Sequence, residues 1–380
     1  MIIGYDGKRA VENNTGLGNY SRLLVEQLAT RFPENTYRLY APHIRPNPRM
    51  QNMLLNRNVT IVTPDRPGWQ MLPSLWRSKG MTDSLIQDKV DLFHGLSGEL
   101  PFNIENLHKP TVLTVHDVIF RRFPQYYAAI DRKIYDQKFR QSCHKATRVI
   151  AISECTKRDI MEFYDVPEEN IDVIYQGCHP QFQRTPSPEE IKQVKTKYGV
   201  NGPYIITVGT VETRKNQAIA MRGMYGLPAE LSLVIVGRRT GYARILDRYI
   251  STYKLGNRIK FIENVDFADL PALYAGAFCS SYTSRYEGFG IPVIESLSSG
   301  CPVIVASGSC LEEAGGPGAP AIDPDDMEQW ISIVKEFIDY PEYRRKAIRE
   351  GRKYVERFNN SDMAANVMNT YLRAIKEYRG

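Results

Sequence analysis

The 380-residue chain is 42 % hydrophobic and 24 % charged with a net charge of +6, the composition of a soluble globular protein. Its length exceeds what one core usually serves, so we expect two domains of about 180 residues each, and no apolar run approaches the ~18 residues of a membrane span. The modest positive charge is compatible with an anionic ligand or a weak lipid-surface preference, and it does not imply nucleic acid.

The N-terminal residues Met1 to Asp6 enter a strand directly, without the features of a signal peptide, so we expect a cytoplasmic protein. The six histidines lack metal-ligand spacing. No Cys-x-x-Cys pair occurs, and several cysteines sit in apolar strands, which predicts free, buried thiols. The six cysteines are at positions 143, 155, 178, 279, 301 and 310.

Short apolar strands alternate with helical segments along the whole chain, which is the pattern of parallel sheets with crossover helices. In the first half, strands are predicted at Ile2–Tyr5, Tyr37–Ala41, Val59–Val62, Val90–His94, Thr111–Val115, Val149–Ile152 and Asp172–Tyr175. The second half begins again with Tyr204–Val208, Leu231–Val236, Ile259–Ile262, Ala277–Tyr282 and Pro302–Ala306. The expected fold class is α/β, with two Rossmann-like domains facing one another across a ligand cleft at the carboxyl ends of the strands.

Domain boundaries follow from a proline-rich segment near residue 180. Pro180, Pro186 and Pro188 forbid a continuous helix or a central strand. We therefore predict a first domain over 1–180, a linker over 181–200, a second domain over 201–361 and a final helix over 362–380.

A glycine-containing loop from Thr15 to Ser21, with Gly16 and Gly18, is predicted to precede a helix. Gly-x-Gly after a strand is also typical of dinucleotide binding, but Ser21 replaces the third glycine and the segment from Lys8 to Thr15 separates strand and glycines. No acidic residue follows the second strand to bind a ribose. These differences favour a loop that covers a diphosphate or an acceptor over one that binds a dinucleotide. The alternative is a simple turn at the start of the helix.

The buried strand Thr111–Val115 delivers His116 and Asp117 at its carboxyl end, where α/β sheets bind ligands. Asp117 is expected to orient the histidine or to cap the following loop. A histidine alone in such a place is more often structural than catalytic.

Basic and aromatic residues interleave between Phe120 and Arg148. One interpretation is an ordinary solvated helix face; the other is an acceptor-facing or membrane-facing edge, at the inner face of the cell membrane. No nucleic-acid-binding motif accompanies the stretch. The basic residues are at positions 121, 122, 132, 133, 138, 140, 145 and 148.

In the second half, Gly209 and Thr210 follow the first strand, and Arg214 with Lys215 supplies two cations where a diphosphate leaving group would develop charge. Arg238, after the next strand, is a weaker phosphate candidate.

The segment from Ser284 to Gly300 predicts a strand-to-helix turn that binds an anion. Gly288 and Gly290 flank one aromatic residue, Pro292 opens a helix, and the free N–H groups before it point outward at the positive end of the helix dipole. Glu287 and Glu295 bracket this turn. A ligand with phosphates for the amides and hydroxyls for the carboxylates fits, although glycine-flanked turns of this kind also occur without any ligand.

Asp323-Pro324-Asp325-Asp326 has the form of an Asp-x-Asp metal motif. The proline and the helix predicted over Met327 to Asp339 instead favour Asp325 or Asp326 as a helix N-cap, and with two cations available no metal cofactor is expected.

The pattern Glu-Gly-Phe-Gly-Ile-Pro-x-x-Glu from Glu287, followed by a helix, Gly300 and Pro302-Val303-Ile304, resembles the donor-binding signature of retaining glycosyltransferases of the GT-B fold, family GT4. Gly-x-x-x-x-Arg-Lys-Asn from Gly209 is similar to the same family. The likeness covers nearly the whole chain, and the strand end at His116 with Phe-Pro-x-Tyr-Tyr from Phe123 looks most like bacterial mannosyltransferases of cell-surface polysaccharide assembly.

The resemblance implies a role for each candidate. Glu295 would bind ribose hydroxyls, Glu287 the hydroxyls of the sugar, and His116 the hexose. The base would lie near Val265, and the terminal helix would cross back to the first domain. The diphosphate would be held by Arg214, Lys215 and the backbone amides of Gly288, Phe289, Gly290 and Ile291.

We therefore expect a retaining glycosyltransferase that moves a hexose, best mannose from GDP-mannose, to a glycan or polyprenyl-linked glycan acceptor. No residue is an evident nucleophile, so retention would proceed by front-face attack, with the leaving phosphate taking the acceptor proton. Alternatives are a UDP-sugar donor such as UDP-glucose or UDP-GlcNAc, an NAD-dependent oxidoreductase, and a non-catalytic sugar-nucleotide binder.

Overall fold

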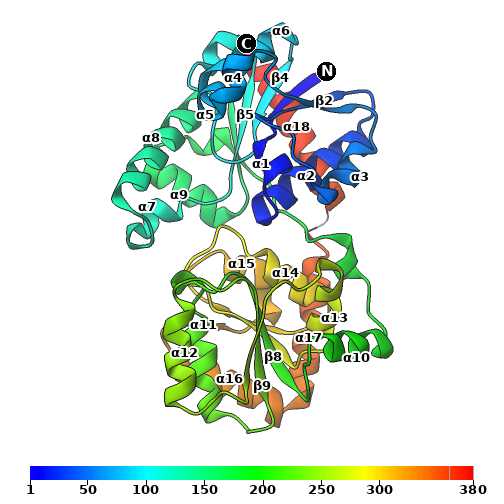
Figure 1. Cartoon of the computed structure of the whole chain (residues 1–380), viewed down its shortest axis with the longest axis vertical. Coiled ribbons are helices and arrows are strands. Elements are labelled where there is room, and N and C mark those ends of the chain that lie inside the picture. The colour runs from blue at the N-terminus through cyan, green and yellow to red at the C-terminus, as the bar shows by residue number, and fades with distance from the viewer. Residues whose placement is uncertain (359, 380) are drawn as a thin grey trace. The chain divides into compact units, whose positions relative to one another are not determined.

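The computed structural model describes residues 1–358 and 360–379, and the chain divides into two compact units (Figure 1). Unit 1 comprises Met1–Gln176 and Asn359–Gly380, and unit 2 comprises Gly177–Phe358. Each unit has one parallel sheet with helices on both sides. This is the arrangement that alternating strands and helices produce.

The sheet of unit 1 has seven strands in the order β3-β2-β1-β4-β5-β6-β7, all parallel. Its central strands β1, β4, β5 and β6 are buried almost throughout, because helices cover both faces of the sheet, whereas the edge strands β3 and β7 are partly exposed. The strands are β1 (Ile2–Asp6), β2 (Thr36–Tyr40), β3 (Val59–Val62), β4 (Leu92–Gly95), β5 (Thr111–Val115), β6 (Arg148–Ala151) and β7 (Ile171–Val173).

The helices of unit 1 include the last helix of the chain, α18, which packs against α2. Val367 and Tyr371 of α18 are fully buried in the core, and the Tyr371 hydroxyl lies 2.7 Å from Nδ1 of His94 on β4. The terminal helix thus completes unit 1. The helices are α1 (Lys8–Glu12), α2 (Gly16–Arg31), α3 (Gln51–Leu54), α4 (Pro67–Met71), α5 (Pro73–Leu75), α6 (Met81–Gln87), α7 (Ile119–Arg122), α8 (Ala129–Lys145), α9 (Glu154–Tyr164) and α18 (Asn360–Arg379).

The sheet of unit 2 has six parallel strands in the order β10-β9-β8-β11-β12-β13. Its strands are β8 (Tyr204–Val208), β9 (Ser232–Val236), β10 (Ile259–Ile262), β11 (Cys279–Tyr282), β12 (Val303–Ala306) and β13 (Ala321–Ile322). Its helices are α10 (Pro188–Lys197), α11 (Gln217–Gly223), α12 (Ala243–Thr252), α13 (Leu270–Ala275), α14 (Ile291–Ser298), α15 (Leu311–Gly315), α16 (Met327–Asp339) and α17 (Pro341–Val355).

The linker expected at 181–200 is wrong, because the units separate at Gln176 and this segment belongs to unit 2. Pro188 does not interrupt structure here. It occupies the first turn of α10, behind a capping box formed by Ser187 and Glu190, and α10 packs on α13.

The six cysteines are free and buried, as predicted. Among the residues that the structure describes, no helix is both long enough and apolar enough to span a bilayer.

Candidate functional site

The loops after β8 and β11 of unit 2 lie side by side, because these strands are neighbours in the sheet. The Arg285 backbone N–H donates to the carbonyl oxygen of Arg214 at 2.8 Å, and the Thr283 hydroxyl donates to that of Asn216 at 3.3 Å. Asn216 has φ of 53°, a left-handed conformation that turns the chain from this loop into α11. Sequence-distant residues are thereby fixed against one another.

These loops bring Arg214 and Lys215 onto Glu287. Oε1 of Glu287 lies 2.5 Å from Nζ of Lys215 and 2.9 Å from Nη1 of Arg214. The Lys215 ammonium also donates to the Tyr282 hydroxyl at 2.6 Å, and Nη2 of Arg214 pairs with Glu212 at 2.7 Å. Two cations and two carboxylates thus form one cluster with no net charge.

The pairing favours the charged forms of Glu287, Arg214 and Lys215. Burial works to raise the pKa of Glu287, but Lys215 and Arg214 outweigh it and lower the pKa to about 2. Burial also works to lower the pKa of both cations, and the carboxylates raise it instead. The two cations therefore hold the ionised Glu287 carboxylate in a fixed position, where it can accept further hydrogen bonds.

The N-terminus of α14 follows directly after Glu287. Gly290 is the N-cap with φ of 110°, and a Cβ there would lie 2.8 Å from Cδ2 of Leu311. Pro292 lies in the first turn of the helix, as the sequence predicts, where its missing N–H would have had no intrahelical partner. Phe289 is 3 % exposed and its ring packs edge-on against Phe358, so this side chain belongs to the core of unit 2.

Glu295, on the same helix, is in a different environment. It is 9 % exposed, and its Oε2 accepts one long hydrogen bond, 3.5 Å, from the Tyr274 hydroxyl. Burial raises its pKa to about 7, against the lowering effect of that hydrogen bond. At neutral pH Glu295 is therefore poised between its neutral and charged forms.

The other unit 2 candidates lie at the same edge of the sheet. Gly209 has φ of 144°, and a Cβ on the neighbouring Gly237 would run into its carbonyl oxygen, so the backbones approach closely there. The Thr210 carbonyl accepts from the Gln217 side chain at 2.9 Å. Arg238 is exposed and Val265 is half-buried.

The Asp-Pro-Asp-Asp segment serves the local fold. Asp326 is the N-cap of α16 and accepts from the Gln329 N–H at 2.9 Å, which confirms one of the two predicted caps. Asp325 pairs with Arg285 through both of its carboxylate oxygens. In the described part of the chain no group of three or more histidine, cysteine or acidic side chains is placed to hold a metal ion.

In unit 1, His116 lies at the end of β5 as predicted. Its Nε2 donates to the Leu96 carbonyl at 2.9 Å, and the ring meets Tyr20 edge-on at 4.7 Å between centroids. Burial lowers its pKa to about 4, so the ring is neutral at pH 7 with Nδ1 as an acceptor. Asp117 accepts from the Ile119 N–H at 3.1 Å, which caps the following turn.

The prediction that Gly16 and Gly18 lie in a loop is wrong, because α2 already begins at Gly16. The N-cap is Thr15, and Oδ1 of Asn13 accepts from the Gly18 N–H of the first turn at 3.3 Å. A Cβ at Gly18 would run into the Asn13 carbonyl, whereas Gly16 faces open space. Gly18 is thus required for packing α1 against α2.

Most basic residues between Phe120 and Arg148 have partners within unit 1, which favours the structural interpretation of this stretch. Arg148 is 1 % exposed and joins Asp172 to Glu377 of α18. The other pairs are Arg121–Asp136, Arg122–Asp159, Arg122–Glu162, Lys138–Glu99 and Lys145–Glu105, and Arg140 donates to the Phe163 carbonyl.

Four residues that lie beside the candidates were not predicted from the sequence: Glu212, Tyr274, Tyr282 and Tyr20. Tyr282 ends a predicted strand next to the turn, and Glu212 lies inside the Gly209 motif, so both could have been found. Tyr20 lies within the Thr15 to Ser21 segment and could have been found as well, whereas Tyr274 sits in a helix with no distinguishing pattern and only the packing reveals it.

Two family models match the chain: Glycosyltransferase Family 4 over residues 15–182 and Glycosyl transferases group 1 over residues 188–354. O-antigen chain mannosyltransferase B of Escherichia coli is 24 % identical over 383 residues, 94 % of this chain and 96 % of that protein. O-antigen chain mannosyltransferase RfbU of Salmonella typhimurium strain LT2 is 30 % identical over 259 residues, 68 % of each chain.

Among solved structures, Anabaena HepE in complex with UDP and glucose has a TM-score of 0.76 at 18 % identity, covering 97 % of this chain and 99 % of that one. This likeness establishes the GT-B glycosyltransferase fold. The chain belongs to the group 1 and family 4 glycosyltransferases. The expected enzyme class is thereby confirmed, and the alternatives of an oxidoreductase and a non-catalytic binder are set aside.

Proposed function

We propose that the protein transfers a hexose, with retention of configuration, from a nucleoside diphosphate sugar to a glycan acceptor, and that the donor is GDP-mannose. The observation that carries this proposal is the contact of Glu287 with Lys215 and Arg214 beside the N-terminus of α14. It places a carboxylate that can accept hydrogen bonds from sugar hydroxyls beside two cations and the positive end of a helix dipole, which suits a sugar attached to a diphosphate. Relatives named as mannosyltransferases support mannose.

In this proposal the cations and the helix N-terminus stabilise the diphosphate as it leaves, and the leaving phosphate takes the acceptor proton. Arg214 already holds Glu212 and the Tyr286 carbonyl, so Lys215 is the more direct phosphate ligand and Arg214 sets the position of Glu287. Glu295 binds the ribose and His116 a sugar hydroxyl. No metal cofactor takes part.

We also propose a peripheral contact of unit 1 with the inner face of the membrane. The support for this contact comes from the region of α4 and α5 and not from the basic stretch. Met71 is 82 % exposed and Leu72, between the two helices, is 54 % exposed. The nearby residues Arg66 and Lys79 are exposed as well.

The donor is tested by a thermal-shift panel of GDP, UDP, ADP and NAD, followed by hydrolysis assays with the matching sugar donors. GDP should stabilise most, and GDP-mannose should be hydrolysed. Stabilisation by UDP with turnover of UDP-glucose or UDP-GlcNAc would show that the donor is a UDP-sugar and would leave the proposed type of reaction unchanged. Stabilisation by NAD alone would overturn the proposal.

A further inference from the structure

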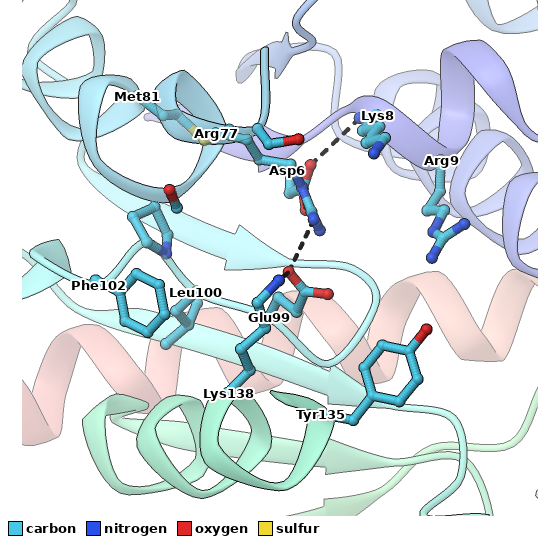
Figure 2. Close-up of a pocket in the computed structure, with 13 residues that line it drawn as sticks. Asp6, Lys8, Arg9, Arg77, Met81, Glu99, Leu100, Phe102, Tyr135 and Lys138 are labelled. Carbon is cyan, nitrogen blue, oxygen red and sulfur yellow. Dashed lines mark hydrogen bonds and ion pairs between the residues drawn. The ribbon is translucent and has the colours of Figure 1, made fainter. Parts of the chain in front are cut away.

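Unit 1 contains a pocket of about 210 Å³ at the carboxyl ends of β1 and β4 (Figure 2). Asp6 is the last residue of β1, and Glu99 follows β4 by a short loop. The pocket is also lined by residues from α1, from the helical segment around Arg77 and from α8. None of the roles assigned above uses it.

The base of the pocket is a compensated charge cluster. Nε of Arg77 donates to Asp6 at 2.9 Å, and its Nη1 donates to Glu99 at 2.8 Å. Lys138 donates to the same Glu99 oxygen at 3.2 Å. Two cations and two carboxylates therefore cancel, and they hold the wall of the pocket rigid.

Lys8 and Arg9 add two further positive charges to this neutral base. Among the residues that the structure describes, neither takes part in an ion pair, and the buried Nε of Arg9 has no hydrogen-bond partner. A buried donor without a partner is costly, and an anion that accepted a hydrogen bond from it would relieve that cost. Figure 2 shows Lys8 and Arg9 on one side of the pocket and Tyr135 and Lys138 on the other.

The position of Arg9 links the pocket to the candidate sugar-binding residue. Besides burial, the charge of Arg9 contributes to lowering the pKa of His116, so the two side chains are electrostatic neighbours. The segments that line the pocket also carry exposed apolar side chains. Ser74 lines it and Leu75, the next residue, is 42 % exposed; Tyr135 lines it and Ile134 is 47 % exposed.

We propose that this pocket binds the diphosphate of a lipid-linked acceptor, with Lys8 and Arg9 as its ligands and the apolar residues beside Ser74 and Tyr135 along the lipid. The proposal rests on the proposed function for the need of an acceptor. A net excess of two positive charges suits a phosphate-type dianion, and charge-assisted hydrogen bonds from Lys and Arg are the usual way proteins hold one.

The test is a calorimetric titration of the full chain with farnesyl diphosphate and, separately, with inorganic pyrophosphate. The protein is first saturated with the nucleoside diphosphate that stabilises it most, which occupies the unit 2 site. Lys8→Ala and Arg9→Ala should each weaken farnesyl diphosphate binding by about tenfold to a hundredfold. Lys133→Ala, an exposed cation on α8 outside the pocket, should leave binding unchanged.

The two ligands separate the sources of the phosphate. Tighter binding of farnesyl diphosphate than of pyrophosphate supports a lipid-linked acceptor, and equal binding overturns the lipid part of the proposal. No binding of either ligand, while the nucleotide still binds, overturns the pocket assignment and leaves the proposed function intact. Failure of the nucleotide to bind counts against the proposed function itself.

A stability measurement distinguishes a ligand from a structural role. Because the Nε of Arg9 is unpartnered, Arg9→Ala should leave the Tm unchanged or raise it, and Arg9→Lys should recover part of the anion affinity. A fall of several degrees in Tm for Arg9→Ala would show that Arg9 supports the fold, and would overturn its assignment as a ligand.

Discussion

Glu287 and Glu295 border the same turn and yet differ in charge at neutral pH. The two cations beside Glu287 lower its pKa to about 2, whereas burial without a cation raises that of Glu295 to about 7. Glu287 is therefore a fixed anion, whereas Glu295 can release its proton when a ligand stabilises its charged form. Substitutions of the two residues should therefore have different effects.

Lys215→Ala should lower kcat by about a hundredfold, a loss of about 3 kcal/mol of transition-state stabilisation, with a smaller effect on donor affinity. The physical reason is that charge on the diphosphate grows as the bond to the sugar breaks. Steady-state kinetics with the donor measure this, with Lys254→Ala, at the end of α12, as a control. A raised KM with unchanged kcat would contradict the assignment.

Glu295→Gln should change how stability depends on pH. The native pKa of about 7 lies above the ordinary 4.5, so the folded state holds a proton that the unfolded state has released between these values. The contribution of this group to stability therefore falls as pH rises from about 4.5 to 7, by at most about 1.4 kcal/mol per unit.

Glutamine does not titrate, so Glu295→Gln should match the wild type near pH 4.5 and exceed its free energy of unfolding by about 1 to 3 kcal/mol at pH 8. Urea unfolding across this range is the measurement. A constant difference between the two proteins would show that Glu295 does not titrate abnormally.

At the scale of elements, α14 depends on one backbone conformation. Gly290→Ala would place a Cβ in a left-handed conformation and 2.8 Å from Leu311. We expect a loss of about 1 to 3 kcal/mol in stability, together with weaker nucleotide binding, because the amides before α14 move. Gly241→Ala, where a Cβ meets nothing within 4 Å, is the control. Equal behaviour of the two variants in thermal unfolding and nucleotide titration would refute this account.

Most elements could be predicted because a buried parallel strand has a plain signature of short apolar runs. Val59–Val62, Thr111–Val115, Tyr204–Val208 and Ile259–Ile262 have the predicted bounds. The two-residue β13 was missed, since so short a strand has no pattern. The start of α2 was misplaced because both glycines lie in the first turn of the helix, directly after the N-cap Thr15.

The candidate site could be predicted as a set of residues, but its internal pairing could not. Lys215 and Glu287 are 72 residues apart, and they meet only because β8 and β11 are adjacent in the sheet. Strand order is decided by packing, and no local pattern encodes it. For the same reason the pairing of Arg148 with Glu377 on α18 was not foreseen.

At the scale of the whole molecule, the chain supplies its own positive charge at both candidate sites. In unit 2 the positive groups are Arg214 and Lys215, which Glu212 and Glu287 compensate in the absence of a ligand, and the N-terminus of α14. In unit 1 they are Lys8 and Arg9. Activity should therefore persist in excess EDTA, because these groups can replace a divalent ion at the diphosphate. Loss of activity on chelation, with recovery on adding Mg²⁺ or Mn²⁺, would return Asp323 and Asp325 to consideration as ligands.

The central claim is that unit 2 holds the nucleotide through Glu295 and the transferred sugar through Glu287. Calorimetric titration with GDP alone at pH 8, where Glu295 is ionised, tests it most directly. Glu295→Gln should weaken GDP binding by about tenfold to a hundredfold, since charge-assisted hydrogen bonds to the ribose are lost, while Glu287→Gln should bind GDP as the wild type does and fail only in sugar transfer. The opposite pattern would reverse the two assignments, and unchanged binding and transfer in both variants would contradict the account of this site.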